Sequence, residues 1–285
     1  MLPTIPLPGT LYVVSTPIGN REDITLRALR ILREVSLVAC EDTRRTSLLL
    51  RHFQITTPVL SYHKFNEKKR LDKLLQSLQD GKSVALVSDA GTPSLSDPGA
   101  ILIRTCRRSG IPVSAIPGAS AVLAALAASP FAGEAYLFFG FLPASAGRRQ
   151  KVLERLKDVP WNLVFYESPL RVRECLKDII QILGNRIVFW GRELTKHFEE
   201  TIESSAGEIL SQISTREIKG EITLIVKGAA GEAVSPGNLP SAVEDARGLI
   251  QSQGFSKKEA AKRAAEQHGF SSREIYQELI KAQHM

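Results

Sequence analysis

The chain has 285 residues, of which 43% are apolar, 24% charged and 6% aromatic. This composition is typical of a compact soluble protein and excludes a disordered or fibrous chain. No apolar run approaches the roughly 18 to 20 residues that span a bilayer, so we expect no membrane segment. Three cysteines far apart form no CxxC pair and the histidines show no ligand spacing, so we expect no metal site, no disulfide framework and a reducing, cytoplasmic setting.

The first half of the chain alternates between strand and helix patterns. A buried strand is expected over 10–15, and apolar residues then recur at helical spacing after Asp23, which is a plausible helix N-cap. The further strands are expected over 37–39, 84–88 and 113–116, and the further helices over 46–52, 67–78 and 101–108. This alternation favours parallel βαβ units in an α/β architecture.

The second half also predicts a sheet, which we expect to be mixed. Ser168 followed by Pro169 is typical of an N-cap and a first helical residue, and Cys175 falls on the apolar face of the helix they would begin. The strands are expected over 136–140, 163–166, 187–190, 198–203 and 221–226.

Three domains follow from these patterns. We expect an N-terminal α/β domain over 1–130, a second α/β domain over 131–232, and a linker with a helical module over 233–285. Three short helices are expected in the module, and together they resemble a helix-turn-helix. Capping boxes are expected at Ser256 with Glu259 and at Ser271 with Glu274, and Gly269 fits a left-handed C-cap.

The net charge of +7 is unevenly distributed along the chain. Residues 1–130 carry 16 Lys and Arg against 10 Asp and Glu, a surplus of +6, while 131–232 balance at 14 each and 233–285 carry 7 against 6. A basic first half suits a polyanion such as RNA, because phosphate neutralisation releases counterions. A basic surface kept for solubility explains the surplus equally well.

The common nucleotide, zinc-protease and hydrolase motifs are absent, but three loops rich in small residues each follow an expected strand. They span 15–20, 88–99 and 117–121. In an open α/β sheet, loops at the carboxyl ends of strands form the ligand crevice, and Gly and Pro let the backbone approach a ligand closely. Three such loops in one domain favour a nucleotide-like ligand.

These loops, together with 220–223, resemble the tetrapyrrole methylase superfamily of S-adenosylmethionine-dependent methyltransferases. Longer blocks are similar to a branch of that superfamily that 2'-O-methylates a cytidine in the decoding centre of 16S rRNA. The blocks are 9–53, 61–67, 86–99, 139–143, 165–169 and 192–196. The resemblance implies two α/β domains with the cofactor in the cleft between them, a 16S rRNA substrate in the small ribosomal subunit, and a homodimer.

The resemblance also implies the residues that line the cofactor site. They are Pro17, Ile18, Asp89, Ala90, Gly91, Leu95, Ser120, Ala121, Tyr166, Glu221 and Ile222. Asp89 is the best side-chain candidate for a ribose or ammonium contact. From spacing alone, an Asx-turn before Gly91 is about as good an explanation of Asp89.

Two polar clusters are candidates for the acceptor side. Without the resemblance, each has a plainer explanation: an ion-paired loop over 41–45, and a first-turn carboxylate at Glu67 that complements a helix dipole. With the resemblance we favour a catalytic group made of Glu41, Asp42, Arg44, His63, Asn66 and Glu67. Glu41 or Asp42 is the expected base, and Arg44 is expected to contact a phosphate or nucleobase.

Basic side chains near these clusters are candidate RNA contacts, although each could equally be a solvated charge. They are Arg45, Lys64, Lys68, Lys69, Arg148, Arg149, Lys257 and Lys258, the last two on what we expect to be the first helix of the C-terminal module. Two alternatives to an rRNA ribose methyltransferase remain: a corrinoid or porphyrin methyltransferase of the same superfamily, and a non-catalytic RNA-binding assembly protein.

Overall fold

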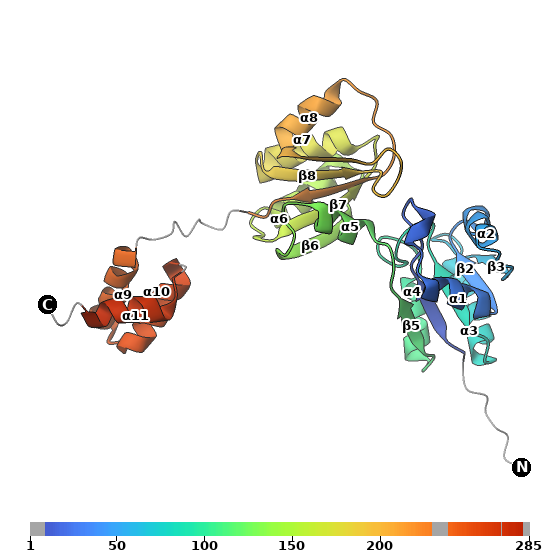
Figure 1. Ribbon diagram of the computed structural model, residues 1–285, viewed down its shortest axis with the longest axis horizontal. Helices are drawn as coiled ribbons and strands as arrows, with labels where there is room; N and C mark the ends of the chain where they lie inside the picture. The colour runs from blue at the N-terminus through green and yellow to red at the C-terminus, as the bar shows by residue number, and fades with distance from the viewer. Residues whose placement is uncertain (1–8, 230–238, 269, 282–285) are drawn as a thin grey trace, which may run out of the picture. The chain divides into compact units, whose positions relative to one another are not determined.

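The computed structural model describes residues 9–229, 239–268 and 270–281. The chain divides into two compact units, Met1–Gly228 and Ala229–Met285. The first unit contains two five-stranded sheets with helices on their faces, and the second contains three helices (Figure 1).

The first sheet is entirely parallel, with the strand order β3-β2-β4-β1-β5. Its strands are β1 Leu11–Val14, β2 Leu37–Cys40, β3 Val59–Ser61, β4 Val84–Val87 and β5 Val113–Ile116. The helices that connect or follow them are α1 Leu26–Glu34, α2 Thr43–His52, α3 Glu67–Gln79, α4 Ala100–Arg108 and α5 Ala121–Ala128, with a 3-10 turn η1 at Arg21–Asp23. Helices therefore alternate with strands as the sequence predicts.

Both faces of this sheet are covered because successive strand residues point to opposite sides. Along β4, Ala85 and Val87 pack with Leu32 of α1, whereas Val84 and Leu86 pack in a second cluster against α3 and α4. A parallel sheet covered on both faces reads as a continuous apolar run, which is what the four residues of β4 show.

The second sheet is mixed, with the order β6-β7-β10-β8-β9, as expected. β6 pairs with β7 in parallel and the remaining neighbours are antiparallel. Its strands are β6 Tyr136–Phe141, β7 Asn162–Glu167, β8 Ile187–Arg192, β9 Glu200–Ser205 and β10 Ile222–Val226, and its helices are α6 Ala146–Leu156, α7 Val172–Leu183 and α8 Ala206–Ser214. Cys175 is fully buried in the core of this region, where we expected a packing residue.

One face of the second sheet packs against elements of the first half of the chain. Val164, Phe189 and Ile225 share a buried cluster with Val122 of α5 and with Ile18, which follows β1. The loops after β1 and before α5 are therefore fixed directly beside the second sheet.

The C-terminal unit is the expected three-helix module, with α9 Leu239–Gln253, α10 Lys257–His268 and α11 Ser272–Lys281. The capping box at Ser271 is present, because the Glu274 amide donates to Ser271 Oγ and the Ser271 amide donates to the Glu274 carboxylate. At Ser256 the Glu259 amide donates to Ser256 Oγ, and the hydroxyl lies 3.4 Å from the Glu259 carboxylate. The helix that begins at Lys257 is the second of the module, not the first as we expected. Gly269 and residues 230–238 of the expected linker lie outside the described residues.

Two helix starts differ from the sequence prediction. Asp23 lies in the 3-10 turn, and the N-cap of α1 is Thr25, whose hydroxyl accepts from the Ala28 amide at 3.1 Å. Helix α7 begins at Val172 rather than at Pro169, since a turn first brings Arg171 back onto the buried carboxylate of Glu167, at 2.7 Å. Strand β3 and helices α6 and α8 were not predicted from the sequence, and α2 begins three residues earlier than expected.

Candidate active site

A cavity of about 270 Å³ lies where the loops of the first sheet meet the second sheet. Ten of the eleven predicted cofactor residues line it, the exception being Pro17, which lines an adjoining cavity. The lining residues are Ile18, Asp89, Ala90, Gly91, Thr92, Leu95, Ser96, Asp97, Ser120, Ala121, Phe141, Tyr166, Glu167, Ser168, Pro169, Gly220, Glu221, Ile222 and Thr223.

The three small-residue loops are joined to one another at this cavity. Thr16 and Gly91 form an isolated antiparallel bridge between the loops after β1 and β4. Thr92 Oγ1 lies 2.9 Å from Ser15 Oγ and donates to the Ala119 carbonyl, which adds the loop after β5. Gly91 has a φ of +75°, and a Cβ there would lie 3.3 Å from the Ile18 side chain. A glycine is therefore suited to the point where the loops approach most closely.

Acidic side chains line one part of this cavity and apolar ones another. Burial and the neighbouring Glu41 carboxylate raise the pKa of Asp97 to about 6. Asp89 and Glu221 also line the cavity, and the apolar part includes Phe141 and Tyr166. The cavity thus combines carboxylates that can accept from an ammonium or ribose hydroxyl with aromatic rings that can contact a nucleobase.

Asp89 joins the cofactor loop to the predicted acceptor cluster instead of forming an Asx-turn. Its Oδ1 accepts from the Asp42 amide at 3.0 Å, and its Oδ2 lies 3.6 Å from Arg45 Nη1. Both contacts arise because β2 and β4 are adjacent parallel strands, so their carboxyl ends meet at one edge of the sheet.

Asp42 itself has a structural role in this arrangement. It is the N-cap of α2, and its carboxylate accepts from the amide, Nε and Nη2 of Arg44 at 2.8 to 3.1 Å. These hydrogen bonds hold the pKa of Asp42 at about 2, which makes it a weak base. Arg44 is turned to solvent, with 88% of its side chain exposed, and among the described residues its ion pair is with Asp42, the N-cap of its own helix.

Glu41 has the opposite character. It is half-buried, and burial together with the nearby Asp89 carboxylate raises its pKa, although His63 and Arg45 oppose that shift. A carboxylate whose charged form is disfavoured is a better proton acceptor near neutral pH than Asp42. Of the two predicted bases, the geometry favours Glu41.

The second predicted cluster, after β3, is a loop held by its own side chains. Asn66 Oδ1 accepts from the His63 amide at 2.8 Å, and Asn66 Nδ2 donates to the Ser61 carbonyl and hydroxyl. Glu67 is the first residue of α3, as its plainer explanation requires. Phe65, at the tip of this loop, is 94% exposed. The loop therefore presents an aromatic ring to solvent on a fixed backbone.

Most of the predicted RNA contacts are available at the surface, but Arg149 is not. Arg149 is buried in α6, where its Nε donates to Asp178 of α7 at 2.6 Å. Its charge is used within the core, so we withdraw it from the RNA contacts. The exposed members are Arg45, Lys64, Lys68, Lys69, Arg148 and Lys258, whereas Lys257 is half-buried.

A second cavity of about 220 Å³ adjoins the first and shares Ile18, Asp89, Ala90 and Glu221 with it. Two of its cations, Arg21 and Lys196, were not among the site residues predicted from the sequence. Its lining residues are Pro17, Ile18, Gly19, Arg21, Arg45, Thr46, Leu49, Ser88, Asp89, Ala90, Lys196 and Glu221. The shared wall places the acidic cavity directly beside one that carries three basic side chains.

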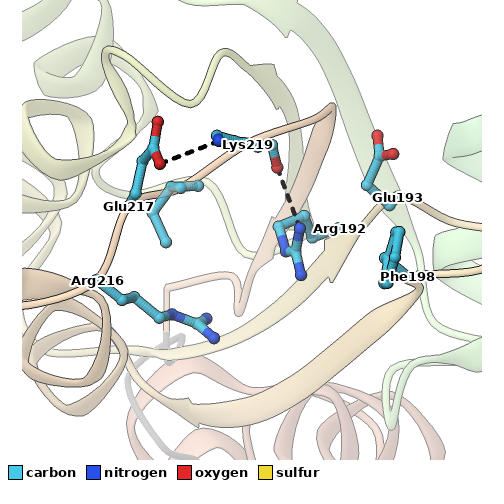
Figure 2. Close-up of a pocket in the computed structure, with 7 residues that line it drawn as sticks. Arg192, Glu193, Phe198, Arg216, Glu217 and Lys219 are labelled. Atoms are coloured by element: carbon cyan, nitrogen blue, oxygen red, sulfur yellow. Dashed lines mark hydrogen bonds and ion pairs between the residues drawn. The ribbon is translucent and has the colours of Figure 1, made fainter.

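A third cavity, of about 370 Å³, lies at the loops of the second sheet, over residues 192–219 (Figure 2). Its charges are largely paired with one another: Lys219 lies 3.0 Å from Glu217, and Arg192 Nη1 donates to the Lys219 carbonyl. Arg192 and Arg216 also both pair with Glu200, at 2.9 and 2.7 Å. We interpret this cavity as a surface depression around an ion-pair network.

Comparison with known proteins decides the family. The pattern of the tetrapyrrole (corrin/porphyrin) methylases matches residues 10–210, which include every loop of the first two cavities up to Lys196. The chain belongs to this family. The family uses S-adenosylmethionine, so the chain is a methyltransferase with that cofactor.

Curated relatives cover nearly the whole chain. A protein of Halalkalibacterium halodurans is 44% identical over 94% of this chain and 93% of its own length, and one of Escherichia coli O157:H7 is 42% identical over 96% of each. A Thermotoga maritima protein is 47% identical over 77% of this chain and 99% of its own. All three are named ribosomal RNA small subunit methyltransferase I.

Solved structures confirm the expected fold. The methyltransferase CobJ matches with a TM-score of 0.61 over 78% of this chain and 95% of its own, at 17% identity. Uroporphyrin-III C-methyl transferase from Thermus thermophilus, complexed with S-adenosyl homocysteine, matches with 0.55 over 77% and 97%, at 21% identity. At these identities the likeness shows the fold alone.

Neither a metal-binding cluster nor a membrane-spanning helix is found among the described residues. Within 9–229, 239–268 and 270–281, no group of three or more His, Cys, Asp or Glu could hold a metal ion. No helix in the part of the chain that the structure describes is long and apolar enough to cross a membrane.

Proposed function

We propose that this chain methylates the 2'-hydroxyl of a cytidine in the decoding centre of 16S rRNA, with S-adenosylmethionine as the methyl donor. The observation that carries the proposal is the wall that the acidic cavity shares with the basic one. The names of the curated relatives support ribosomal RNA of the small subunit as the substrate.

The chemistry of the acidic cavity fits the cofactor. S-Adenosylmethionine carries an ammonium group and a sulfonium, and the cavity offers the carboxylates of Asp89, Asp97 and Glu221. Phe141 and Tyr166 give the adenine an apolar surface, and burial raises the pKa of Tyr166 to about 12, so its hydroxyl stays neutral. When bound, the cofactor supplies an electrophilic methyl group.

Glu41 is the residue we assign to the proton. The 2'-oxygen forms a bond to the methyl carbon as the carbon–sulfur bond breaks, and the hydroxyl proton passes to the Glu41 carboxylate. The position of Glu41, after β2 and close to Asp89 and His63, supports this role. Alignment of donor and acceptor at the wall shared by the two cavities supplies much of the remaining acceleration.

The surface beside Glu41 suits a single-stranded nucleic acid. Lys64, Lys68 and Lys69 are exposed on the loop after β3 and the start of α3, and Phe65 lies exposed among them. Cations that track a phosphate backbone and an aromatic ring that stacks on a base are the two usual parts of such a surface.

We assign the C-terminal unit an accessory role in RNA binding. α10 carries the exposed Lys258, while Arg263 on the same helix stacks over Phe255 at 4.1 Å and so contributes to the module's packing. The Thermotoga maritima relative is matched over 99% of its length by only 77% of this chain. Proteins with that name therefore exist without a counterpart of part of this chain.

A homodimer is part of the proposal. The edge strand β6 exposes Tyr136 and Phe139, and an exposed aromatic edge is suited to pairing with another copy. Light scattering of the purified protein tests this part, and a monomer at micromolar concentration contradicts it.

The decisive test incubates the protein with labelled S-adenosylmethionine and small subunits from a strain that lacks the modification. Label in a 2'-O-methylcytidine supports the proposal. Label in uroporphyrinogen but not in the subunits favours the small-molecule alternative. RNA binding without any transfer favours the assembly protein.

The Asp89→Ala variant tests the cofactor cavity separately. We expect its cofactor affinity, measured by calorimetry, to fall more than tenfold, because a hydrogen-bonded carboxylate is lost from the cavity wall. Asp72→Ala, on the exposed side of α3, is the control. An unchanged affinity for Asp89→Ala would remove Asp89 from the site.

A further inference from the structure

The loop over 193–199, between β8 and β9, contains a chemical group that the proposed function leaves unused. The loop is closed at its base, because Arg192 and Glu200 are paired across the two strands and their side chains form an ion pair of 2.9 Å. Arg216 adds a second ion pair to Glu200 at 2.7 Å. The loop therefore extends from a fixed base (Figure 2 shows Arg192, Glu193, Phe198 and Arg216).

The backbone of this loop is strained. Glu193 and Thr195 have φ values of +52° and +66°, in the left-handed region that favours glycine. Such residues cost on the order of 1 to 3 kcal/mol each and persist where the surroundings determine the conformation. Strained residues of this kind cluster at binding sites, and Lys196 lies directly after Thr195.

The loop is pressed against the loop after β1. The Asn20 amide donates to Thr195 Oγ1 at 3.2 Å, and a Cβ on Gly19 would lie only 2.3 Å from Lys196 Cγ. Glycine at position 19 thus leaves the space through which Lys196 reaches the second cavity.

Lys196 lies at the wall that the two cavities share. Its Nζ donates to Glu193 Oε1 at 2.7 Å and to Glu221 Oε2 at 3.1 Å, and Glu221 lines both cavities. An ammonium has three N–H donors, so these two bonds to described residues leave one for a ligand. Burial alone would lower the pKa of Lys196, but the hydrogen bonds to these glutamates outweigh it and raise the pKa, so the group stays cationic.

Two arginines line the same second cavity. Arg21 Nη1 lies 3.3 Å from His52 Nδ1, and Arg45 Nη1 lies 3.6 Å from Asp89 Oδ2, which is long for an ion pair. Three cations and two carboxylates, Asp89 and Glu221, line this cavity, and Glu193, which does not line it, also pairs with Lys196. Guanidinium groups bind phosphate oxygens through paired N–H donors, and an ammonium binds them as a point charge.

We propose that Lys196, with Arg21 and Arg45, binds a backbone phosphate of the RNA next to the target nucleotide and so holds the ribose at the wall shared by the two cavities. The inference rests on the proposed function and adds to it the position of the substrate's phosphate. The strained loop then holds a cation beside Glu221, at a cavity whose other lining residues all come from the first half of the chain.

The experiment compares Lys196→Met, Lys196→Arg and the control Lys177→Met, which removes an exposed ion-paired lysine of α7. Binding of unmodified small subunits is measured by filter retention over a salt series, and cofactor affinity by calorimetry. We expect Lys196→Met to weaken subunit binding about threefold to tenfold and to reduce the salt slope by roughly 0.7 to 0.9, the contribution of one phosphate. Lys196→Arg should restore the slope, and cofactor affinity should stay within twofold.

Two results overturn the inference. One is an unchanged salt slope in Lys196→Met, and the other is an equal loss of cofactor affinity in the Met and Arg variants, which indicates a purely structural loop. Failure of the proposed function is a separate result, because it appears as the absence of 2'-O-methylcytidine with the unaltered protein, whatever the salt slope of the variants.

Discussion

The two sheet regions of the first unit differ in how their buried and half-buried carboxylates are paired. In the second region, Arg149 pairs with Asp178 and Arg171 with Glu167, and all of these except Arg171 are buried. In the first region, Glu41 and Asp97 are half-buried carboxylates that form no ion pair with a described residue, and burial raises the pKa of both.

This difference distinguishes carboxylates that stabilise the fold from carboxylates that are available for a reaction. A buried carboxylate that is paired and hydrogen-bonded fixes helices and turns in place, and its removal exposes the cost of the partner left behind. A half-buried carboxylate without an ion pair costs stability, and groups of this kind cluster at functional sites. On the proposed function, the first region carries the reacting groups and the second region positions the cavity wall beside them.

The Glu41→Gln variant should have the largest effect. Loss of a general base typically lowers the rate about 10²- to 10⁴-fold, and the amide keeps the size of the side chain, so cofactor affinity should be retained. The measurement is single-turnover methyl transfer to small subunits, with calorimetry of cofactor binding.

The matched control for Glu41 is Glu34→Gln, which alters an exposed glutamate of α1. Transfer by Glu41→Gln within threefold of the unaltered protein would mean that the first region does not hold the base, and the contrast between the regions would lose its functional meaning.

Arg149→Met tests the second region. It leaves the Asp178 carboxylate buried with only the Gln150 amide, which donates to it at 2.8 Å. Breaking a buried pair from one side costs about 3 to 5 kcal/mol, so the free energy of unfolding in urea should fall by that amount. Lys177→Met, which breaks an exposed pair with Glu174, should cost less than about 1 kcal/mol.

The pair of arginine and aspartate can also be replaced as a whole. Arg149→Met combined with Asp178→Leu should recover much of the loss, since no charge is then left buried. A loss below 1 kcal/mol in the single variant would show that the second region does not depend on its buried ion pairs.

Asp97→Asn should produce a pH-dependent gain in stability. The pKa of Asp97 is about 6 in the folded chain and near 3.9 in an unfolded one, so the folded state binds more protons between these values. Stability therefore falls as the pH rises from about 4 to about 6 and stays lowered above that. The variant, which cannot ionise, should have the higher Tm at pH 7.5, and the difference should shrink towards pH 4.

The groups that face Asp97 are Glu41, Asp89 and Glu221, whose negative charges all disfavour its ionisation. Thermal melts of both proteins from pH 4 to 8 measure the effect. A difference in Tm that does not change with pH would mean that the folded chain does not raise the pKa of Asp97. The contrast with the ion-paired carboxylates of the second region would then rest on Glu41 alone.

Much of this fold follows from local patterns in the sequence. The strands of the first sheet read as short apolar runs because both of their faces are covered, and the small-residue loops follow them because glycine and proline allow the close approaches at the sheet edge. The start of α7 could not be predicted, because the N-cap signal of Ser168 and Pro169 is overridden by the ion pair of Arg171 with Glu167.

The wrongly placed site residue, Arg149, and the missed ones, Asp97 and Lys196, have different causes. Arg148 and Arg149 are alike in sequence, and only the position of Arg149 on the same helix face as Leu153 and Leu156 indicates that it is buried. Asp97 and Lys196 come from loops whose local sequence does not say which side chains turn inward. Their place depends on contacts across more than 50 residues of chain, which no local pattern records.

Phe65→Ala should have the smallest effect, and it tests which of the two sheet regions contacts the RNA bases. Stacking of one base on an aromatic ring contributes about 1 kcal/mol at the low end, so RNA affinity should fall roughly fivefold while cofactor affinity and the salt slope stay unchanged, because no charge is removed. Leu170→Ala is the control in the second region, where the side chain is 93% exposed and so equally open to solvent. If both variants weaken RNA binding alike, the RNA contacts both regions through apolar side chains. If only Phe65→Ala does, base contacts belong to the first region, beside Glu41.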